Sequence, residues 1–233
     1  MCGRLTLRTP TSALTALFSG LSFPQRAFRF NICPTQPLLC VRQGKSLQLE
    51  AVELRWGLIP AWTKDTGIRT GFINARSETA SSKPSFRDAF QDRRCLIIAD
   101  GFFEWKKNGS AKQPFYICRK DKQPFCLAGL WESWKNEKHP THSPVQTCTV
   151  LTTSANDLMA PIHDRMPVFI APDQYKNWLD PSNHLADTIQ PMMSPLHTDS
   201  LQAYPVSTLV NRPGNDSKEC IVRSNKSTQQ NLF

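Results

Sequence analysis

Short runs of alternating apolar and polar residues cover most of the chain, a pattern typical of β-strands. Leu5 and Leu7 alternate with polar neighbours, which predicts a strand at the start of the chain. Further strands are predicted over 26–32, 37–42, 47–56, 95–107, 114–120, 124–134 and 146–155. The Asn108-Gly109 pair lies between two of these runs and predicts a β-hairpin there.

Three segments carry helical patterns instead. Residues 10–20 begin with Pro and end with Gly, residues 84–94 place apolar side chains on one helical face, and residues 172–180 begin with Pro. Strands outnumber helices and do not alternate with them. The pattern therefore predicts a single α+β domain over 1–222 with a curled, mainly antiparallel, barrel-like sheet and a few peripheral helices. Residues 223–233 are polar and are predicted to form a disordered tail.

Composition and charge restrict the function. No apolar signal core precedes Arg4 and no run approaches the roughly 18 apolar residues of a membrane span, so we expect a cytoplasmic protein, associated with the nucleoid if bacterial. The net charge of +9 favours a polyanionic partner, nucleic acid before an anionic membrane surface. The eight cysteines form no CxxC pair and no zinc-site spacing, so we expect no metal and mostly buried, inert thiols.

Cys2 offers chemistry that an internal cysteine lacks. Removal of Met1 would leave Cys2 with a free α-amine, whose pKa of about 7.8, against about 10.4 for lysine, leaves far more neutral amine at neutral pH. Such an amine forms a Schiff base with an aldehyde, and the neighbouring thiol can then close a thiazolidine ring. On position alone, an incidental small residue is the simpler interpretation.

Three polar segments interrupt apolar runs: 72–79, 99–105 and 161–168. A lone Glu is usually on a solvated strand face, and a lone His is usually part of a structural hydrogen bond. Several such segments in one chain favour a site. Their polar candidates are Asn74, Arg76, Glu78, Glu104, His163, Asp164 and Arg165.

The motifs together resemble one family. They are MCGR at 1–4, RFNICPTQ at 29–36, RWGLIPAW at 55–62, INARSET at 73–79, DGFFEWKK at 100–107 and IHDRMPV at 162–168, with VSTLVN and GNDSKECI further on. In this order and spacing they resemble the SOS-response-associated peptidase (SRAP) family, whose members shield abasic sites in single-stranded DNA. The resemblance runs from residue 2 to about residue 220. Cys33 departs from it, because a smaller residue is more usual there.

The resemblance implies a role for particular residues. Cys2 would be the covalent nucleophile, Asn74 would orient it, and Glu104 and His163 would form the acid–base pair that opens the sugar and expels water. DNA would be held by phosphate-binding arginines and by further polar and aromatic residues: Arg4, Asn31, Trp62, Arg76, Phe86 and Arg165. For both aromatic residues, a place in the core is an equally good interpretation. No cofactor is implied, and the protein would act as a monomer.

The expected function is therefore a covalent thiazolidine crosslink to abasic single-stranded DNA, with a lyase or autoproteolytic side activity also compatible with the family. Two alternatives remain open at the level of sequence. A thiol peptidase could use Cys2 and His163, although no oxyanion hole is visible. The positive charge would also suit a non-covalent binder of modified DNA.

Overall fold

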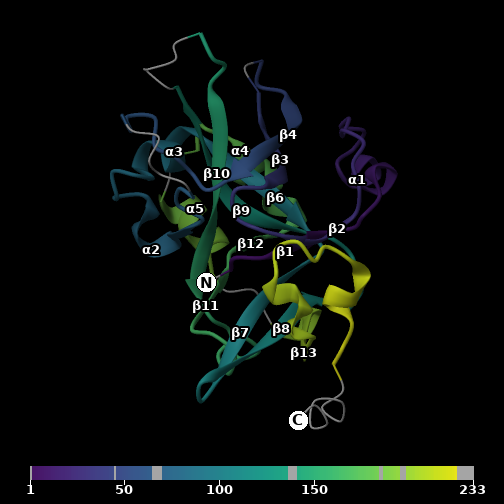
Figure 1. The fold of residues 1–233 in the computed structure, drawn as a ribbon. Helices are drawn as coiled ribbons and strands as arrows, with labels where there is room; N and C mark the ends of the chain where they lie inside the picture. The colour runs from purple at the N-terminus through teal and green to yellow at the C-terminus, as the bar shows by residue number, and fades with distance from the viewer. Residues whose placement is uncertain are drawn as a thin grey trace.

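A computed structural model describes residues 2–44, 46–64, 70–135, 141–183, 186–194 and 198–224. Five strands close into a barrel, which confirms the predicted curled and mainly antiparallel core (Figure 1). They are β3 (Pro37–Gln43), β4 (Leu49–Trp56), β6 (Arg94–Ala99), β9 (Phe125–Trp134) and β10 (Val145–Ser154). The pairing of β9 with β10 closes the ring, and only the β10–β4 pair within it is parallel.

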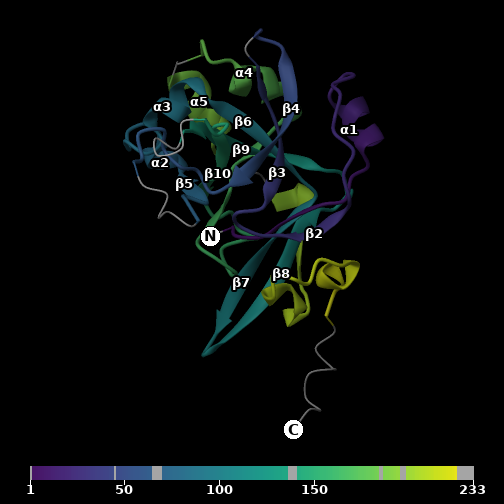
Figure 2. The same cartoon turned by 45° about the horizontal axis from the view of Figure 1, so that its top comes forward.

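A second sheet of five strands lies beside the barrel. Its order is β13 (Leu201–Pro205), β8 (Ala111–Arg119), β7 (Gly101–Asn108), β1 (Leu5–Leu7) and β2 (Arg29–Ile32). The β7–β8 hairpin extends away from the barrel (Figures 1 and 2). Three short strands join the barrel sheet: β5 (Asn74–Arg76), β11 (Arg165–Pro167) and β12 (Phe169–Ile170).

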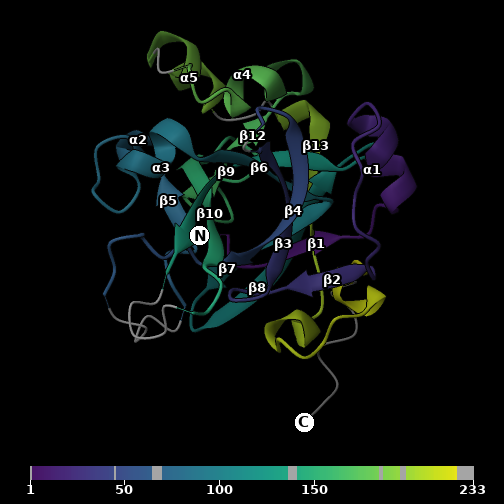
Figure 3. The ribbon, with the colours of Figure 1, turned by 90° about the horizontal axis from the view of Figure 1, so that it is seen from above.

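The helices lie around the barrel, with α1 on one side and α2 and α3 on another (Figure 3). They are α1 (Thr11–Leu17), α2 (Ser77–Ala80), α3 (Arg87–Asp92), α4 (Tyr175–Leu179) and α5 (Ala186–Met192). Single 3₁₀ turns are η1 (Pro172–Gln174), η2 (Thr198–Ser200), η3 (Thr208–Asn211) and η4 (Lys218–Ile221). In the described residues, no helix is long and apolar enough to cross a membrane.

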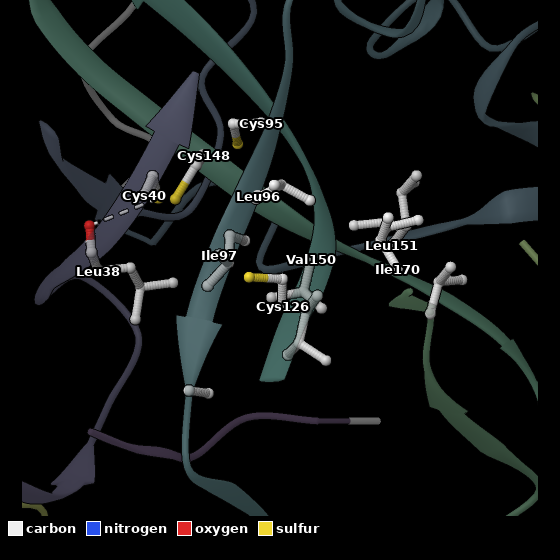
Figure 4. Packing of buried hydrophobic residues seen from close by; sticks show 14 of the residues in the cluster. Leu38, Cys40, Cys95, Leu96, Ile97, Cys126, Cys148, Val150, Leu151 and Ile170 are labelled. Atoms are coloured by element: carbon white, nitrogen blue, oxygen red, sulfur yellow. Dashed lines mark hydrogen bonds between the residues drawn. The ribbon is translucent and has the colours of Figure 1, made fainter. Parts of the chain in front are cut away.

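Aliphatic and cysteine side chains fill the barrel interior, where side chains from β3, β6, β9 and β10 meet (Figure 4). Cys40 of β3, Cys95 of β6 and Cys148 of β10 come together in the barrel interior, and burial raises the pKa of each thiol. All eight cysteines are buried and free, as the apolar runs around most of them predict. These core thiols are held in the neutral, unreactive form.

The run 95–107 was predicted as one strand, but the structure divides it into β6 and β7 at Asp100. The Asp100 carboxylate turns away from strand pairing to accept hydrogen bonds from the backbone N–H groups of Arg8 and Thr9. A side chain at Gly101 would meet the Tyr116 ring at 2.3 Å, so only glycine fits. This break moves the chain from the barrel into the second sheet and sets β7 beside β1.

The hairpin is confirmed, with its turn one residue later than the sequence indicates. Asn108 pairs with Ala111, so Gly109 and Ser110 form the turn, and Gly109 supplies the positive φ of 59°. The predicted tail begins with a residue that is still paired, because Arg223 forms a β-bridge with Val206. Residues 225–233 lie outside the described residues.

Candidate functional site

The start of the chain is held between the two sheets. In β1, Leu5 pairs with Phe102 of β7, and the Phe103 N–H donates to the Arg4 carbonyl at 3.1 Å. This antiparallel register, continued towards the terminus, brings the first residues alongside Glu104. The N-terminal end lies near β10 and β7 (Figures 1 and 3), and the Cys2 side chain is buried.

Asn74 fixes the Cys2 backbone. It begins β5, which pairs in parallel with β10 at Val150, and its side-chain Nδ2 donates to the Cys2 carbonyl at 2.8 Å. Its Oδ1 is buried and has no hydrogen-bond partner among the described residues. Because a buried amide oxygen without a partner is costly, this atom is suited to accept a hydrogen bond from a bound ligand.

Glu104 brings a buried carboxyl group to the same place. It is 2% exposed on β7, where it pairs with Phe115 of β8. Burial raises the pKa of the Glu104 carboxyl, while positive charge at the chain terminus and on His163 acts in the opposite direction. The carboxyl group can therefore hold a proton at a higher pH than an exposed glutamate. The register of β1 against β7 places Glu104 alongside the first residues of the chain.

His163 lies in the loop between β10 and β11. Its Nδ1 accepts a hydrogen bond from the Arg165 backbone N–H at 3.0 Å. The Asp164 carboxylate also lies 2.9 Å from Nδ1, but that side chain is 83% exposed and can rotate away. Because the backbone N–H can only donate, Nδ1 acts as the acceptor in this contact and Nε2 is left to donate.

The Cys2 thiol is neutral in this environment. Burial raises its pKa well above the ordinary range, and the nearby Glu104 charge acts in the same direction. The Sγ atom contacts the Arg4 carbonyl at 3.9 Å. An unactivated thiol next to a buried carboxyl group favours chemistry that begins at the amine, not at a thiolate.

The three predicted phosphate-binding arginines differ in their surroundings. Arg76 is exposed at the end of β5. Arg165 is paired with both carboxylate oxygens of Glu78 and donates to the Thr152 carbonyl. Arg4 donates to the Asn31 Oδ1 at 3.1 Å and to carbonyls of η3.

The remaining predicted DNA contacts differ in how far they are buried. Asn31 is fully buried, and its amide donates to three carbonyls of the segment 210–215. Trp62 is 62% exposed in the segment after β4. Phe86 is buried edge-on against Phe72, at 5.3 Å between ring centroids, and Phe72 is the more exposed of the two. The structure thus brings together the four predicted catalytic residues and places Asn31 in a structural network.

Residues 1–213 match the protein family described as SOS response associated peptidase (SRAP). The chain belongs to the SRAP family. It is 42% identical over 226 residues to the abasic site processing protein YoqW of Bacillus subtilis, covering 95% of this chain and 99% of that one. YedK of Escherichia coli, also named an abasic site processing protein, is 33% identical over 157 residues, which are 67% of this chain and 66% of that one.

The fold is shared with solved structures. A protein from Bacteroides thetaiotaomicron superposes with a TM-score of 0.81 at 25% identity, covering 96% of this chain and all of that one. The SRAP resemblance inferred from the motifs is confirmed by the family match.

Two features of this SRAP chain could not be assigned from its sequence. Glu78 is one of the polar candidates named from the sequence. Its ion pair with Arg165 could not be predicted, because the two residues are 87 positions apart and sequence periodicity does not report such contacts. A depression of about 260 Å³ beside the site is lined by Trp105, Lys106 and Lys107 on one side and residues 161–164 on the other. Its lysines fall in a strand-like run, which by itself indicates only a solvated face. In the described part of the chain, no three His, Cys, Asp or Glu side chains gather as metal ligands.

Proposed function

We propose that this protein captures abasic sites in single-stranded DNA by forming a thiazolidine crosslink through Cys2, after Met1 is removed. The observation that carries the proposal is the hydrogen bond from Asn74 to the Cys2 carbonyl, which fixes the reactive residue next to the buried Glu104 carboxyl group. The names of the relatives, which are abasic site processing proteins, agree with this substrate.

The chemistry balances with the residues present. The closed sugar opens to its aldehyde, and the neutral Cys2 amine adds to the carbonyl carbon to give a carbinolamine. Loss of water then requires a proton for the departing hydroxyl group, which the protonated Glu104 carboxyl group can supply. The thiol adds to the imine carbon and its proton passes to the nitrogen, so one water is released overall.

The state of the thiol favours this route over a peptidase. A cysteine peptidase attacks with a thiolate and needs an adjacent base that takes the thiol proton. Here burial and Glu104 both raise the pKa of the Cys2 thiol. In thiazolidine formation the thiol is tethered to the imine carbon that it attacks, and the imine nitrogen takes the thiol proton as the ring closes.

DNA would be held by phosphate contacts that read no sequence. Arg76 is exposed beside Asn74 and can meet a phosphate directly. Arg165 and Arg4 would contact the DNA while keeping their present hydrogen-bond partners in the protein. The exposed Trp62 and the Phe72–Phe86 pair offer ring surfaces for bases next to the lesion.

A matched pair of proteins tests the amine mechanism. One carries native Cys2, and the other carries a retained Gly before it, with both termini verified by mass. The extra residue turns the amine into an amide, so we expect a heat-stable adduct with abasic single-stranded DNA only from the native terminus, seen on a denaturing gel.

Cys2→Ala provides the control, because it loses the crosslink while keeping the reversible binding that the arginines support. Equal adduct from the native and extended proteins would exclude the amine as nucleophile. Cleavage of an unrelated peptide by the native protein alone would favour the peptidase.

A further inference from the structure

The β7–β8 hairpin carries lysines beyond the candidate site. Lys106, Lys107 and Lys112 are all exposed. Lys107 and Lys112 are directly opposite one another in the strand register, where like charges destabilise a hairpin. Within the described residues, no carboxylate forms a salt bridge with any of the three. The hairpin therefore keeps a concentration of positive charge that does not help it fold.

Two of these lysines, Lys106 and Lys107, lie next to the candidate site. Side chains alternate along a strand, so Lys106 shares the face of β7 that carries Glu104, roughly 7 Å further along. Lys106 and Lys107 line the 260 Å³ depression whose other wall, residues 161–164, carries His163. The depression therefore reaches His163, one member of the predicted acid–base pair.

The residues that line the depression carry a net positive charge, which favours binding of an anion. Among the described residues, Asp164 is the one acidic side chain that lines it, and its carboxylate lies against His163. Two lysines against one acid leave a positive surface. A DNA strand whose abasic sugar sits at Cys2 has its next phosphates within reach of such a surface, and lysine binds phosphate as a point charge without reading the base.

We infer that the β7–β8 hairpin is a further DNA-binding surface, on which Lys106, Lys107 and Lys112 hold backbone phosphates of the strand that leaves the site past His163. The inference rests on the proposed function and extends it, because it makes the DNA footprint longer on one side of the lesion. The other phosphate-binding candidates, Arg76 and Arg165, lie on different strands, β5 and β11.

The test measures non-covalent binding to a single strand without an abasic site, as a function of salt. The variant K106Q/K107Q/K112Q is compared with K120Q/K122Q/K176Q, which loses the same charge from exposed lysines on the β8–β9 turn and α4. Each lost phosphate contact lowers the log–log salt slope by about 0.7, so the hairpin variant should lose about 2 in slope while the control retains the native value. Equal slopes for the two variants would overturn the inference.

A second variant separates binding from folding. Lys112→Glu replaces a like-charge pair with an opposite-charge pair across the hairpin, so the melting temperature should rise while DNA affinity falls. A parallel fall in both would overturn the inference by assigning the lysines a structural role. Crosslinking of the native protein to abasic DNA is measured separately, and its absence would reject the proposed function. Normal crosslinking together with an unchanged salt slope in the hairpin variant would reject the hairpin surface alone.

Discussion

Burial acts in the same direction on the two ionisable side chains beside the chain terminus. It raises the pKa of the Cys2 thiol and of the Glu104 carboxyl group, so each holds its proton more strongly than it would in water. A protonated carboxyl group can serve as an acid, and a protonated thiol cannot compete with the amine for the aldehyde. The environment therefore sets the order of attack, first nitrogen and then sulfur.

Glu104→Gln should slow crosslinking about 10²–10⁴-fold, because glutamine keeps the shape but cannot transfer a proton. Initial DNA binding should change little. Single-turnover crosslinking rates across pH check this, since the native rate should fall as pH rises through the raised Glu104 pKa and the variant should lack that limb. A native-like rate and pH profile in the variant would assign Glu104 a structural role.

The same substitution should stabilise the fold at neutral pH. A carboxyl group whose pKa is raised in the folded state binds more protons there than when unfolded, so its contribution to stability is complete below the unfolded pKa of about 4.3 and is lost as pH rises through the folded value. Glutamine has no such loss. Denaturant unfolding should show the gain of Glu104→Gln near pH 7 and little of it near pH 4.

For single residues, the sequence predicts those whose chemistry is unusual for their place in the chain. Cys2 and Glu104 are singled out by the motifs that resemble the SRAP family, since position alone would leave Cys2 an incidental small residue. The burial of Asn31 could not be predicted, because its partners are carbonyl groups about 180 positions away. A backbone carbonyl carries no side-chain identity, so nothing in the composition of residues 210–215 indicates that contact.

Among the elements, β10 aligns the site. It pairs with β5 on one edge at Thr152–Arg76 and with β11 on another at Thr152–Pro167. The position of Asn74, on β5, and that of His163, in the loop before β11, are therefore both set by β10. The Glu78–Arg165 ion pair, with oxygen–nitrogen distances of 2.5 and 2.8 Å, links α2 to β11 across the end of β10. We expect this pair to keep the two sides of the site in register.

Glu78→Gln should therefore reduce the crosslinking rate more than it reduces stability. The pair is partly exposed, with the Glu78 side chain 47% accessible, so its loss should cost no more than about 1 kcal/mol in unfolding free energy. Asp88→Asn, which breaks an exposed Arg87–Asp88 pair within α3, is the matched control. Equal crosslinking rates for the two variants would remove the aligning role.

Strand positions were predictable, whereas the division of one run was not. The alternation of apolar residues gives β1, β3, β4, β8, β9 and β10 close to their observed bounds. The break at Asp100 depends on backbone N–H groups of residues 8 and 9, which only the folded chain brings near. Very short elements such as α2 and β5 contain too few residues for any period to be visible.

In the whole molecule, residues 207–221 pack against the first strands of the chain and against β7. The segment 207–221 covers β2, where it receives Asn31, and contacts β7 through the Trp105–Asn211 hydrogen bond of 2.8 Å. Arg4 donates to Val210 and lies 5.9 Å from the Trp105 ring. The C-terminal segment therefore supports the strand that carries Cys2 and the strand that carries Glu104.

Asp216 is the principal link in this arrangement. Its carboxylate accepts hydrogen bonds from the backbone N–H groups of Phe30 and Asn31 and from the Arg29 side chain. Asp216→Ala leaves two strand N–H groups without their acceptor, and hydrogen bonds to a charged partner are each worth about 1.5–3 kcal/mol. We expect a loss of about 2–3 kcal/mol in unfolding free energy, allowing for partial replacement by water, and slower crosslinking because Arg4 loses its support.

Asp121→Ala is the matched control for this prediction. Asp121 also pairs with an arginine, Arg119, and accepts a backbone N–H from Gln123, but both partners lie two residues away and the carboxylate is exposed. A local, exposed pair should contribute at most about 1 kcal/mol. Denaturant unfolding and crosslinking rates should therefore separate the two variants. Similar losses from both would mean that the joining of distant segments by Asp216 adds nothing beyond an ordinary surface ion pair.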